Sequence, residues 1–119
     1  MGAPIFQIER EGATLVIAPQ RSVTSLSDDD VKAEMAGILE ALESGDAKNI
    51  VFDFNRLEYC GSSMLEAMRR LWKNLPHGQG KLVICNANPV LRDILHVTRF
   101  DTLWPIYNTR EEALGATGS

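Results

Sequence analysis

Two adjacent serines, Ser62 and Ser63, stand where a polar loop gives way to an amphipathic stretch with helical spacing. The first backbone N–H groups of a helix have no intrahelical acceptor, and the helix dipole favours negative charge there. A phosphate on either serine would therefore be stabilised, which makes the pair a chemically sensible phosphorylation site. Ser63 also stands three residues before Glu66, the spacing of a capping box that needs no modification. The residues alone leave both interpretations open.

Cys60 is the candidate nucleophile closest to the two serines. A thiol near a helix N-terminus can be activated as a thiolate, because the helix end stabilises its negative charge. The two histidines, His77 and His96, lie at the ends of other predicted helices, so neither is placed to act as its base. An enzyme that uses Cys60 stays an alternative hypothesis, and we expect no catalytic residue.

The sequence contains no motif typical of a metal-binding or nucleotide-binding site. No cluster of His and Cys has the spacing of metal ligands. The Gly-Gln-Gly segment at 78–80 lacks the lysine of a phosphate-binding loop and precedes a strand, not a helix. Asp53, Glu58 and Glu66 are better explained by loop and cap roles than as paired catalytic carboxylates. We therefore expect no metal, no cofactor and no enzymatic activity.

The strands that must hold these residues are predicted from apolar runs. Residues 49–54 and 81–85 are continuous apolar runs, which is typical of interior strands buried on both faces. A Glu-Gly turn separates two short strands, 5–10 and 14–18, in a hairpin. A last strand at 104–107 contains Pro105 and is therefore expected at a sheet edge.

The helices are predicted from one-sided apolar stripes and from their caps. They are expected after a Ser27 cap, at the Ser62–Ser63 pair, after an Asn88 cap with Pro89 in the first turn, and from a Thr109–Glu112 capping box to Leu114. The tail from residue 115 is expected to fray. The order β-β-α-β-α-β-α-β-α predicts an α/β fold: a mixed sheet, largely parallel after its hairpin, with helices mainly packed on one face.

Composition narrows the class of protein. The 119 residues carry 45% hydrophobic and 24% charged side chains, which suits a single globular domain of residues 1–119. A formal net charge of −4 argues against a nucleic-acid partner. No apolar run approaches the ~20 residues of a membrane span, and no signal peptide is visible. Two cysteines without an export signal are expected to be reduced, so we expect a cytoplasmic protein.

The sequence resembles the STAS domain family of bacterial anti-sigma factor antagonists. The resemblance covers about residues 5–114 and is carried by IVFDFNRLEYCGSSMLEAM at 50–68, GKLVICNANPVLRDILHVTRFDTL at 80–103 and PIYNTREEAL at 105–114. The family typically has an Asp-Ser-Ser-Gly-Leu signature that opens a helix, a Gly-x-Leu-x-Leu strand and an Asn-x-x-Pro helix start. The resemblance implies a STAS-like mixed sheet.

The resemblance also implies a regulatory mechanism. In such proteins an anti-sigma factor with serine kinase activity phosphorylates the second serine of the signature, which matches Ser63, with Ser62 as its neighbour. The unphosphorylated protein binds the anti-sigma factor, and the phosphoprotein releases it until a serine phosphatase acts. The partner is then expected to contact the residues around the serines: Glu58, Tyr59, Gly61, Ser62, Ser63, Met64 and Glu66.

Three departures from the family pattern bear on this mechanism. Gly61 stands in place of the usual Asp, Met64 in place of Gly, and Glu66 where a small residue is common. Met64 and Glu66 are expected to add bulk and charge where the partner approaches. The segment 19–26 also lacks a clear match to an Asp that usually contacts the partner. These departures favour an alternative: a STAS adaptor or scaffold in a signalling or transport complex that binds its partner constitutively.

Overall fold

Five strands form one sheet whose order in space equals their order in sequence. The computed structural model describes residues 6–20, 28–43, 47–75 and 80–117. The strands are β1 (Phe6–Glu11), β2 (Thr14–Pro19), β3 (Asn49–Asp53), β4 (Leu82–Cys85) and β5 (Ile106–Tyr107). β1 pairs antiparallel with β2, and each later pair, β2–β3, β3–β4 and β4–β5, is parallel. The predicted mixed sheet with an N-terminal hairpin is confirmed.

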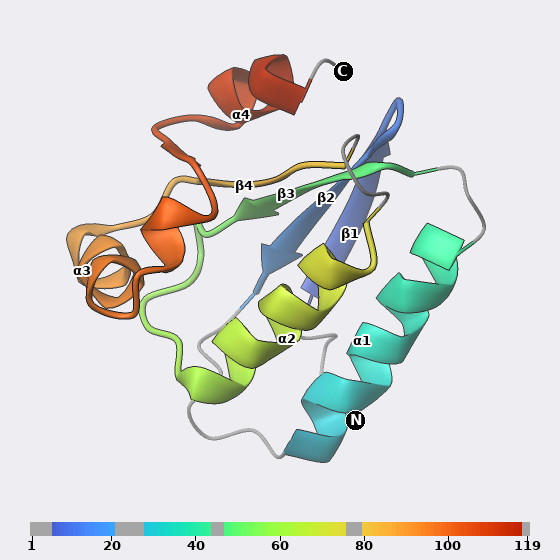
Figure 1. Cartoon of the computed structure of the whole chain (residues 1–119), viewed down its shortest axis with the longest axis horizontal. Helices are drawn as coiled ribbons and strands as arrows, with labels where there is room; N and C mark the ends of the chain where they lie inside the picture. Colours follow the sequence, from blue (N-terminus) through green and yellow to red (C-terminus); the bar gives the residue numbers. More distant parts are fainter. Residues whose placement is uncertain (1–5, 21–27, 44–46, 76–79, 118–119) are drawn as a thin grey trace.

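Helices follow each strand from β2 onward, and the last of them ends the described chain. They are α1 (Asp28–Glu43), α2 (Ser62–Lys73), α3 (Pro89–Val97), the 3-10 turn η1 (Phe100–Thr102) and α4 (Arg110–Thr117). α1 and α2 lie side by side against one face of the sheet (Figure 1). The main core lies between them and the strands, and every residue of β3 and β4 is buried, as the apolar runs predicted. The expected Ser27 cap of α1 lies outside the described residues.

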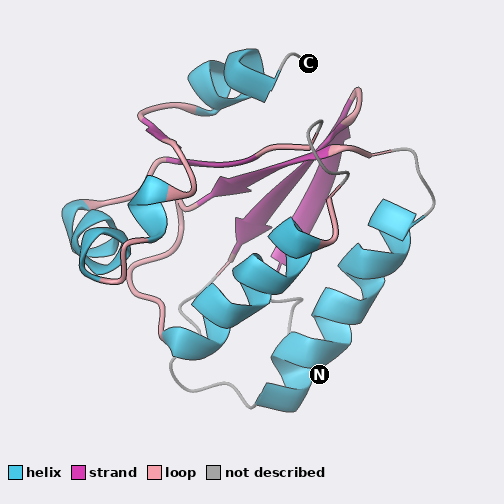
Figure 2. Cartoon of the chain, in the orientation of Figure 1, coloured by secondary structure: helices cyan, strands magenta, loops and turns pink. Residues whose placement is uncertain are grey.

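α4 packs on the opposite face of the sheet. Figure 2 shows it alone above the strands, with α1 and α2 below them. A second, smaller apolar cluster joins Val16, Val51 and Val83 of the sheet to Ala113 of α4. The helices are therefore mainly, but not all, on one face.

The C-terminal helix is longer than the sequence predicted. The expected fraying is wrong for residues 115–117, because α4 continues to Thr117, and residues 118–119 lie outside the described part of the chain. The Thr14 and Thr117 hydroxyls are hydrogen-bonded at 3.2 Å in a buried position, and the Asn49 amide donates to the Thr117 carbonyl at 3.3 Å. These bonds hold the last turn against the ends of β2 and β3. The Thr109 cap of α4 is confirmed, since its hydroxyl accepts from the Glu112 N–H at 3.1 Å.

The last strand is shorter than predicted. The expected strand at 104–107 reduces to Ile106–Tyr107, at the sheet edge where Pro105 placed it. Trp104 instead lies fully buried, its ring stacked on Phe100 with centroids 4.7 Å apart. The backbone N–H of Trp104 donates to the Phe100 carbonyl at 2.9 Å, which closes a helical turn. Burial of the large indole thus overrides the extended conformation.

Candidate functional site

The loop between β3 and α2 alternates between exposed and buried residues, with Asn55, Arg56, Glu58 and Tyr59 exposed. Leu57 and Cys60 point into the core with 2% and 1% exposure, while Glu58 and Tyr59 between them are exposed. The Phe54 N–H donates to the Cys85 carbonyl at 2.9 Å, and the Leu57 N–H to the Phe54 carbonyl at 3.0 Å. Two buried anchors therefore fix the backbone that presents Glu58 and Tyr59.

Asn88 fastens this loop to α3. Its side-chain oxygen accepts from the Leu91 N–H at 2.8 Å, which confirms the predicted N-cap. Its amide also donates to the carbonyls of Leu57 (3.4 Å) and Glu58 (3.3 Å). The second role was not predicted, because sequence spacing reveals a cap within one helix but not a contact with a loop some 30 residues away.

A polar cluster closes the carboxyl end of β3. The buried carboxylate of Asp53 accepts from the Asn55 N–H (3.0 Å), the Asn86 amide (2.9 Å) and the guanidinium of Arg110 (2.9 Å). Asn86 has a φ of 59°, a left-handed conformation that Asn adopts more readily than most residues. Through Asn55 and Arg110, the cluster joins the start of the loop between β3 and α2 to α4.

Arg110 bridges the buried Asp53 and the exposed Glu9. Burial opposes the charged form of Arg110, but hydrogen bonds to Glu9 and Asp53 outweigh it and raise the pKa of Arg110 above its ordinary value. The contact joins residues 57 positions apart, and no local signal in the sequence could have found it.

α2 begins two residues earlier than a Ser63 cap requires. Gly61 is its N-cap, with φ −100° and ψ −174°, and the Leu65 N–H donates to the Gly61 carbonyl at 3.3 Å. Ser62 and Ser63 are the first two helical residues, and their side chains lie outside what the structure describes. The proposed capping box of Ser63 with Glu66 is therefore wrong, because both residues lie within the helix.

The expected contact residues divide by exposure. Glu66 is exposed and lies three residues after Ser63, on the same side of the helix. Gly61 is half-buried, and an added Cβ would meet open space there. Met64, by contrast, is fully buried in the main core. Its predicted role as bulk that faces a partner is wrong, because position 64 points inward on this amphipathic helix.

Neither cysteine is poised for nucleophilic chemistry. Cys60 and Cys85 are both buried free thiols. Burial raises the pKa of Cys60 to about 11, and burial together with the nearby carboxylate of Asp53 raises that of Cys85 to about 12. The hypothesis of a thiolate at Cys60 is therefore wrong, because the side chain is buried in the main core, where the charged form is disfavoured.

The burial of Cys60 predicts a slow rate of thiol labelling in the folded protein. At pH 8 the raised pKa alone lowers the thiolate fraction of Cys60 about a hundredfold relative to an ordinary thiol, so native protein should react slowly with a disulfide reagent and urea-unfolded protein fast. Above pH 9 the unfolded state loses thiol protons that the folded state keeps, so the free energy of unfolding should fall between about pH 9 and 11. Equal labelling rates in both states would contradict the burial.

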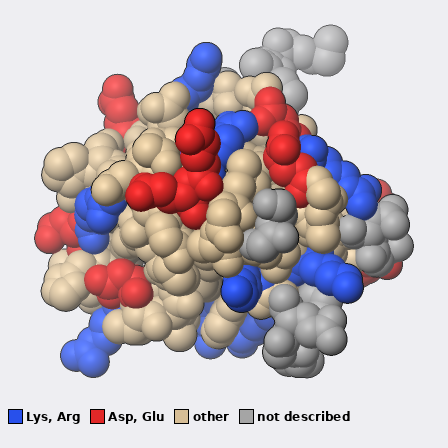
Figure 3. Space-filling model, turned by 90° about the horizontal axis from the view of Figure 1, so that it is seen from above, with Lys and Arg blue, Asp and Glu red and all other residues tan. Residues whose placement is uncertain are grey.

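The surface charge, the titratable groups and the helix lengths were compared with the requirements of a metal site and of a membrane span. On the face that carries α4, acidic and basic side chains lie interspersed (Figure 3). Within the described ranges, no group of three His, Cys, Asp or Glu residues is arranged to hold a metal ion. No helix among the described residues has the length and apolarity needed to cross a membrane.

The sequence and the fold were compared with those of known proteins. The profile of the STAS domain matches residues 6–113. BtrV of Bordetella bronchiseptica, a candidate anti-sigma factor antagonist, is 30% identical over 102 residues, which cover 86% of this chain and 84% of BtrV.

Solved structures share the fold. An anti-sigma-factor antagonist (STAS) domain protein from Planctomyces limnophilus superposes with a TM-score of 0.80 at 30% identity, covering 96% of this chain and 98% of its own. SpoIIAA, an anti-sigma factor antagonist, superposes in its unphosphorylated form with a TM-score of 0.80 at 23% identity, over 95% and 96% of the two chains. Bacillus SpoIIAA in its phosphorylated form superposes with a TM-score of 0.72 at 24% identity, covering 93% of this chain and 97% of its own.

Proposed function

Because the chain belongs to the STAS domain family of anti-sigma factor antagonists, whose members are non-enzymatic regulators, we propose that it binds an anti-sigma factor with serine kinase activity and is switched off by phosphorylation of Ser63. Unmodified, it would hold the anti-sigma factor and free a sigma factor for transcription. A serine phosphatase would reset it. Ser62 is the second choice of acceptor.

One observation supports this proposal: the two serines are the first residues of α2, directly after a loop in which Glu58 and Tyr59 are exposed. The loop is held by core residues and by Asn88, so the exposed pair has a fixed position for a partner. SpoIIAA, whose fold this chain shares, exists in a phosphorylated form. The proposed contact surface is Glu58, Tyr59, Gly61, Ser62, Ser63 and Glu66.

Electrostatics explains how a phosphate would end the contact. A phosphoserine carries about −1.5 to −2 charges at neutral pH. The first turn of a helix tolerates that charge within the chain itself. A partner that already faces Glu58 and Glu66 would meet added negative charge in a surface it must desolvate, which costs binding free energy.

The test is phosphopeptide mass spectrometry. The chain is incubated with ATP and an anti-sigma factor kinase from the same genome, beside Ser63→Ala and Ser62→Ala variants. We expect one added phosphate that maps to residue 63 and disappears only in Ser63→Ala. A phosphate retained by Ser63→Ala would move the acceptor elsewhere.

A second candidate function is a constitutive adaptor. Gly61 stands where the family signature has Asp, and it provides no side-chain hydrogen bond to the helix. A kinase that recognises the Asp of the signature would find no side chain to contact at position 61. If no phosphate is added while the partner stays bound, the chain acts as an adaptor or scaffold without a switch.

Replacing Gly61 with Asp separates the two candidates. Gly61 has an extended backbone with open space around its Cβ, so an Asp fits and can accept hydrogen bonds from the first turn of α2. We expect Gly61→Asp to raise the free energy of unfolding by roughly 0.5–1 kcal/mol in urea titrations. It should also speed phosphorylation of Ser63. An Ala at the same position is the matched control for the lost glycine.

A further inference from the structure

α4 is attached to the sheet by little apolar surface. Of its eight residues, Ala113 and Thr117 are buried and Leu114 is half-buried, while the others are at least partly exposed. The stabilisation from a buried side chain grows with its apolar area, and alanine and threonine have little of it. On the other face, α1 and α2 bury isoleucine, leucine and methionine side chains in the main core. We therefore expect α4 to be the more weakly held layer.

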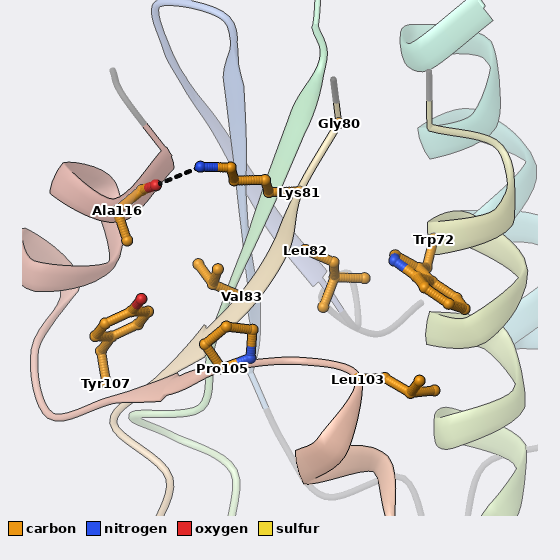
Figure 4. Close-up of a pocket in the computed structure, with 9 residues that line it drawn as sticks. All are labelled: Trp72, Gly80, Lys81, Leu82, Val83, Leu103, Pro105, Tyr107 and Ala116. Carbon is orange, nitrogen blue, oxygen red and sulfur yellow. Dashed lines mark hydrogen bonds between the residues drawn. The ribbon is translucent and has the colours of Figure 1, made fainter. Parts of the chain in front are cut away.

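Polar contacts hold the two ends of α4. At its start the guanidinium of Arg110 donates to the Asp53 carboxylate at 2.9 Å. Near its end the Lys81 ammonium donates to the Ala116 carbonyl at 3.3 Å, a bond drawn as a dashed line in Figure 4. When the helix lifts, water reaches these groups and replaces their partners, so each contact contributes only modestly to the net free energy that keeps α4 in place.

The packing between α4 and the sheet is incomplete at the edge of the sheet. A hollow of about 280 Å³ has Val83, Tyr107 and Ala116 in its lining. In Figure 4, Val83 and Tyr107 lie on the side of β4 that faces α4. Side chains that line such a hollow lack protein neighbours on that side, so this edge adds little close packing to the attachment of α4.

The turn before α4 is anchored by bonds of its own. The guanidinium of Arg92 in α3 donates to the side-chain oxygen of Asn108 at 2.9 Å, and the Asn86 N–H donates to the Tyr107 carbonyl at 3.2 Å. Neither bond involves a residue of α4, so both can persist when the helix lifts. The hinge for such a movement then lies between Asn108 and Arg110.

One cysteine lies beneath each helix layer. Cys85 is fully buried in the smaller apolar cluster, together with Ala113 of α4. Cys60 is 1% exposed and belongs to the main core on the other face. A thiol reagent can reach Cys85 once α4 lifts, but it reaches Cys60 only when the main core opens. The two thiols therefore report on the two layers separately.

We propose that α4 is a strap that opens as one unit, in a minor state of the folded chain that exposes Cys85 and the valines of the smaller cluster while the main core stays closed. Local opening is expected where few buried apolar contacts hold an element. The open chain presents a second apolar surface, on the face of the sheet opposite α2. The inference is therefore independent of the proposed switch at Ser63.

Native-state thiol labelling of two single-cysteine variants, Cys60→Ala and Cys85→Ala, tests the proposal. The disulfide reagent is kept dilute, where the labelling rate rises linearly with its concentration and reports the opening equilibrium. The Cys60 thiol should be protected as strongly as the global unfolding of the same variant in urea predicts. The Cys85 thiol should be protected at least tenfold less than that, and its labelling should respond less to urea, because local opening exposes less surface.

Two substitutions, each added to both single-cysteine variants, identify which layer opens. Ile38 is fully buried in the main core, so Ile38→Val should speed labelling of Cys60 roughly threefold to tenfold and leave Cys85 unchanged, because the main core is intact when only α4 opens. Arg110→Ala should speed both thiols by the same factor, since α4 is detached from Asp53 in the open and in the unfolded state alike.

Two results would overturn the proposal. The first is a Cys85 thiol that is protected as strongly as global unfolding predicts. The second is an Ile38→Val substitution that speeds Cys85 as much as Cys60. In either case α4 would leave the sheet only when the whole chain unfolds, and the two faces of the sheet would form one cooperative unit.

Discussion

Replacing Ser63 with Asp is expected to weaken binding of the anti-sigma factor by about a hundredfold, or roughly 3 kcal/mol, because like charges brought together in an interface cost several kcal/mol. The new carboxylate would stand one helical turn before the exposed Glu66, on a helix that follows the loop carrying the exposed Glu58. Calorimetry with the purified partner measures the effect.

The controls for Ser63→Asp separate charge from shape and from folding. Ser63→Asn has nearly the same size without the charge and should retain most of the affinity. The thermal midpoint of Ser63→Asp should not fall, since an anion in the first turn of α2 is favoured by the helix dipole. If Asp and Asn weaken binding equally, the surface recognises the serine by shape, and the electrostatic account of the switch is wrong.

The largest stability effect is expected at Arg110. Breaking a buried ion pair by removing one partner costs about 3–5 kcal/mol, because it leaves an uncompensated buried charge. Asp53 is 5% exposed, but the side chain of Arg110 is 35% exposed and thus partly screened by water. We therefore expect Arg110→Ala to lower the free energy of unfolding by about 2 kcal/mol in urea titrations.

Glu9→Gln is the matched control for Arg110→Ala. Glu9 contacts the same guanidinium from an exposed position, so its removal should cost less than about 1 kcal/mol. Adding Asp53→Asn to Arg110→Ala should recover part of the loss, because the buried charge is then gone. If Arg110→Ala costs no more than Glu9→Gln, Asp53 does not depend on its pairing with Arg110.

The fold was readable from the sequence wherever local patterns decide structure. The apolar runs NIVFD and LVIC became the fully buried strands β3 and β4. Asn88 and Thr109 both cap the helices that their spacing indicated. Each of these features depends on neighbours within a few residues, so periodicity and cap chemistry suffice to predict them.

The candidate site was less readable, because its features depend on contacts across the chain. Asp53 meets Arg110 through the packing of α4 on the far face of the sheet, which the one-sided arrangement of helices did not suggest. Met64 departs from the family pattern at a position that faces the core, so its bulk concerns packing and not recognition. Cys60, predicted on a loop, is drawn inward as an anchor of that loop.

The placement of α4 has a consequence for how the chain is made on the ribosome. Each strand pairs with the one before it, so the sheet can assemble in the order of synthesis. Among the described residues, the apolar face formed by Val16, Val51 and Val83 is covered mainly by α4, whose Thr117 returns to Thr14 across 103 residues. A nascent chain released as far as β5 therefore displays this strip, and a chaperone that binds apolar segments has a defined target on it until α4 emerges.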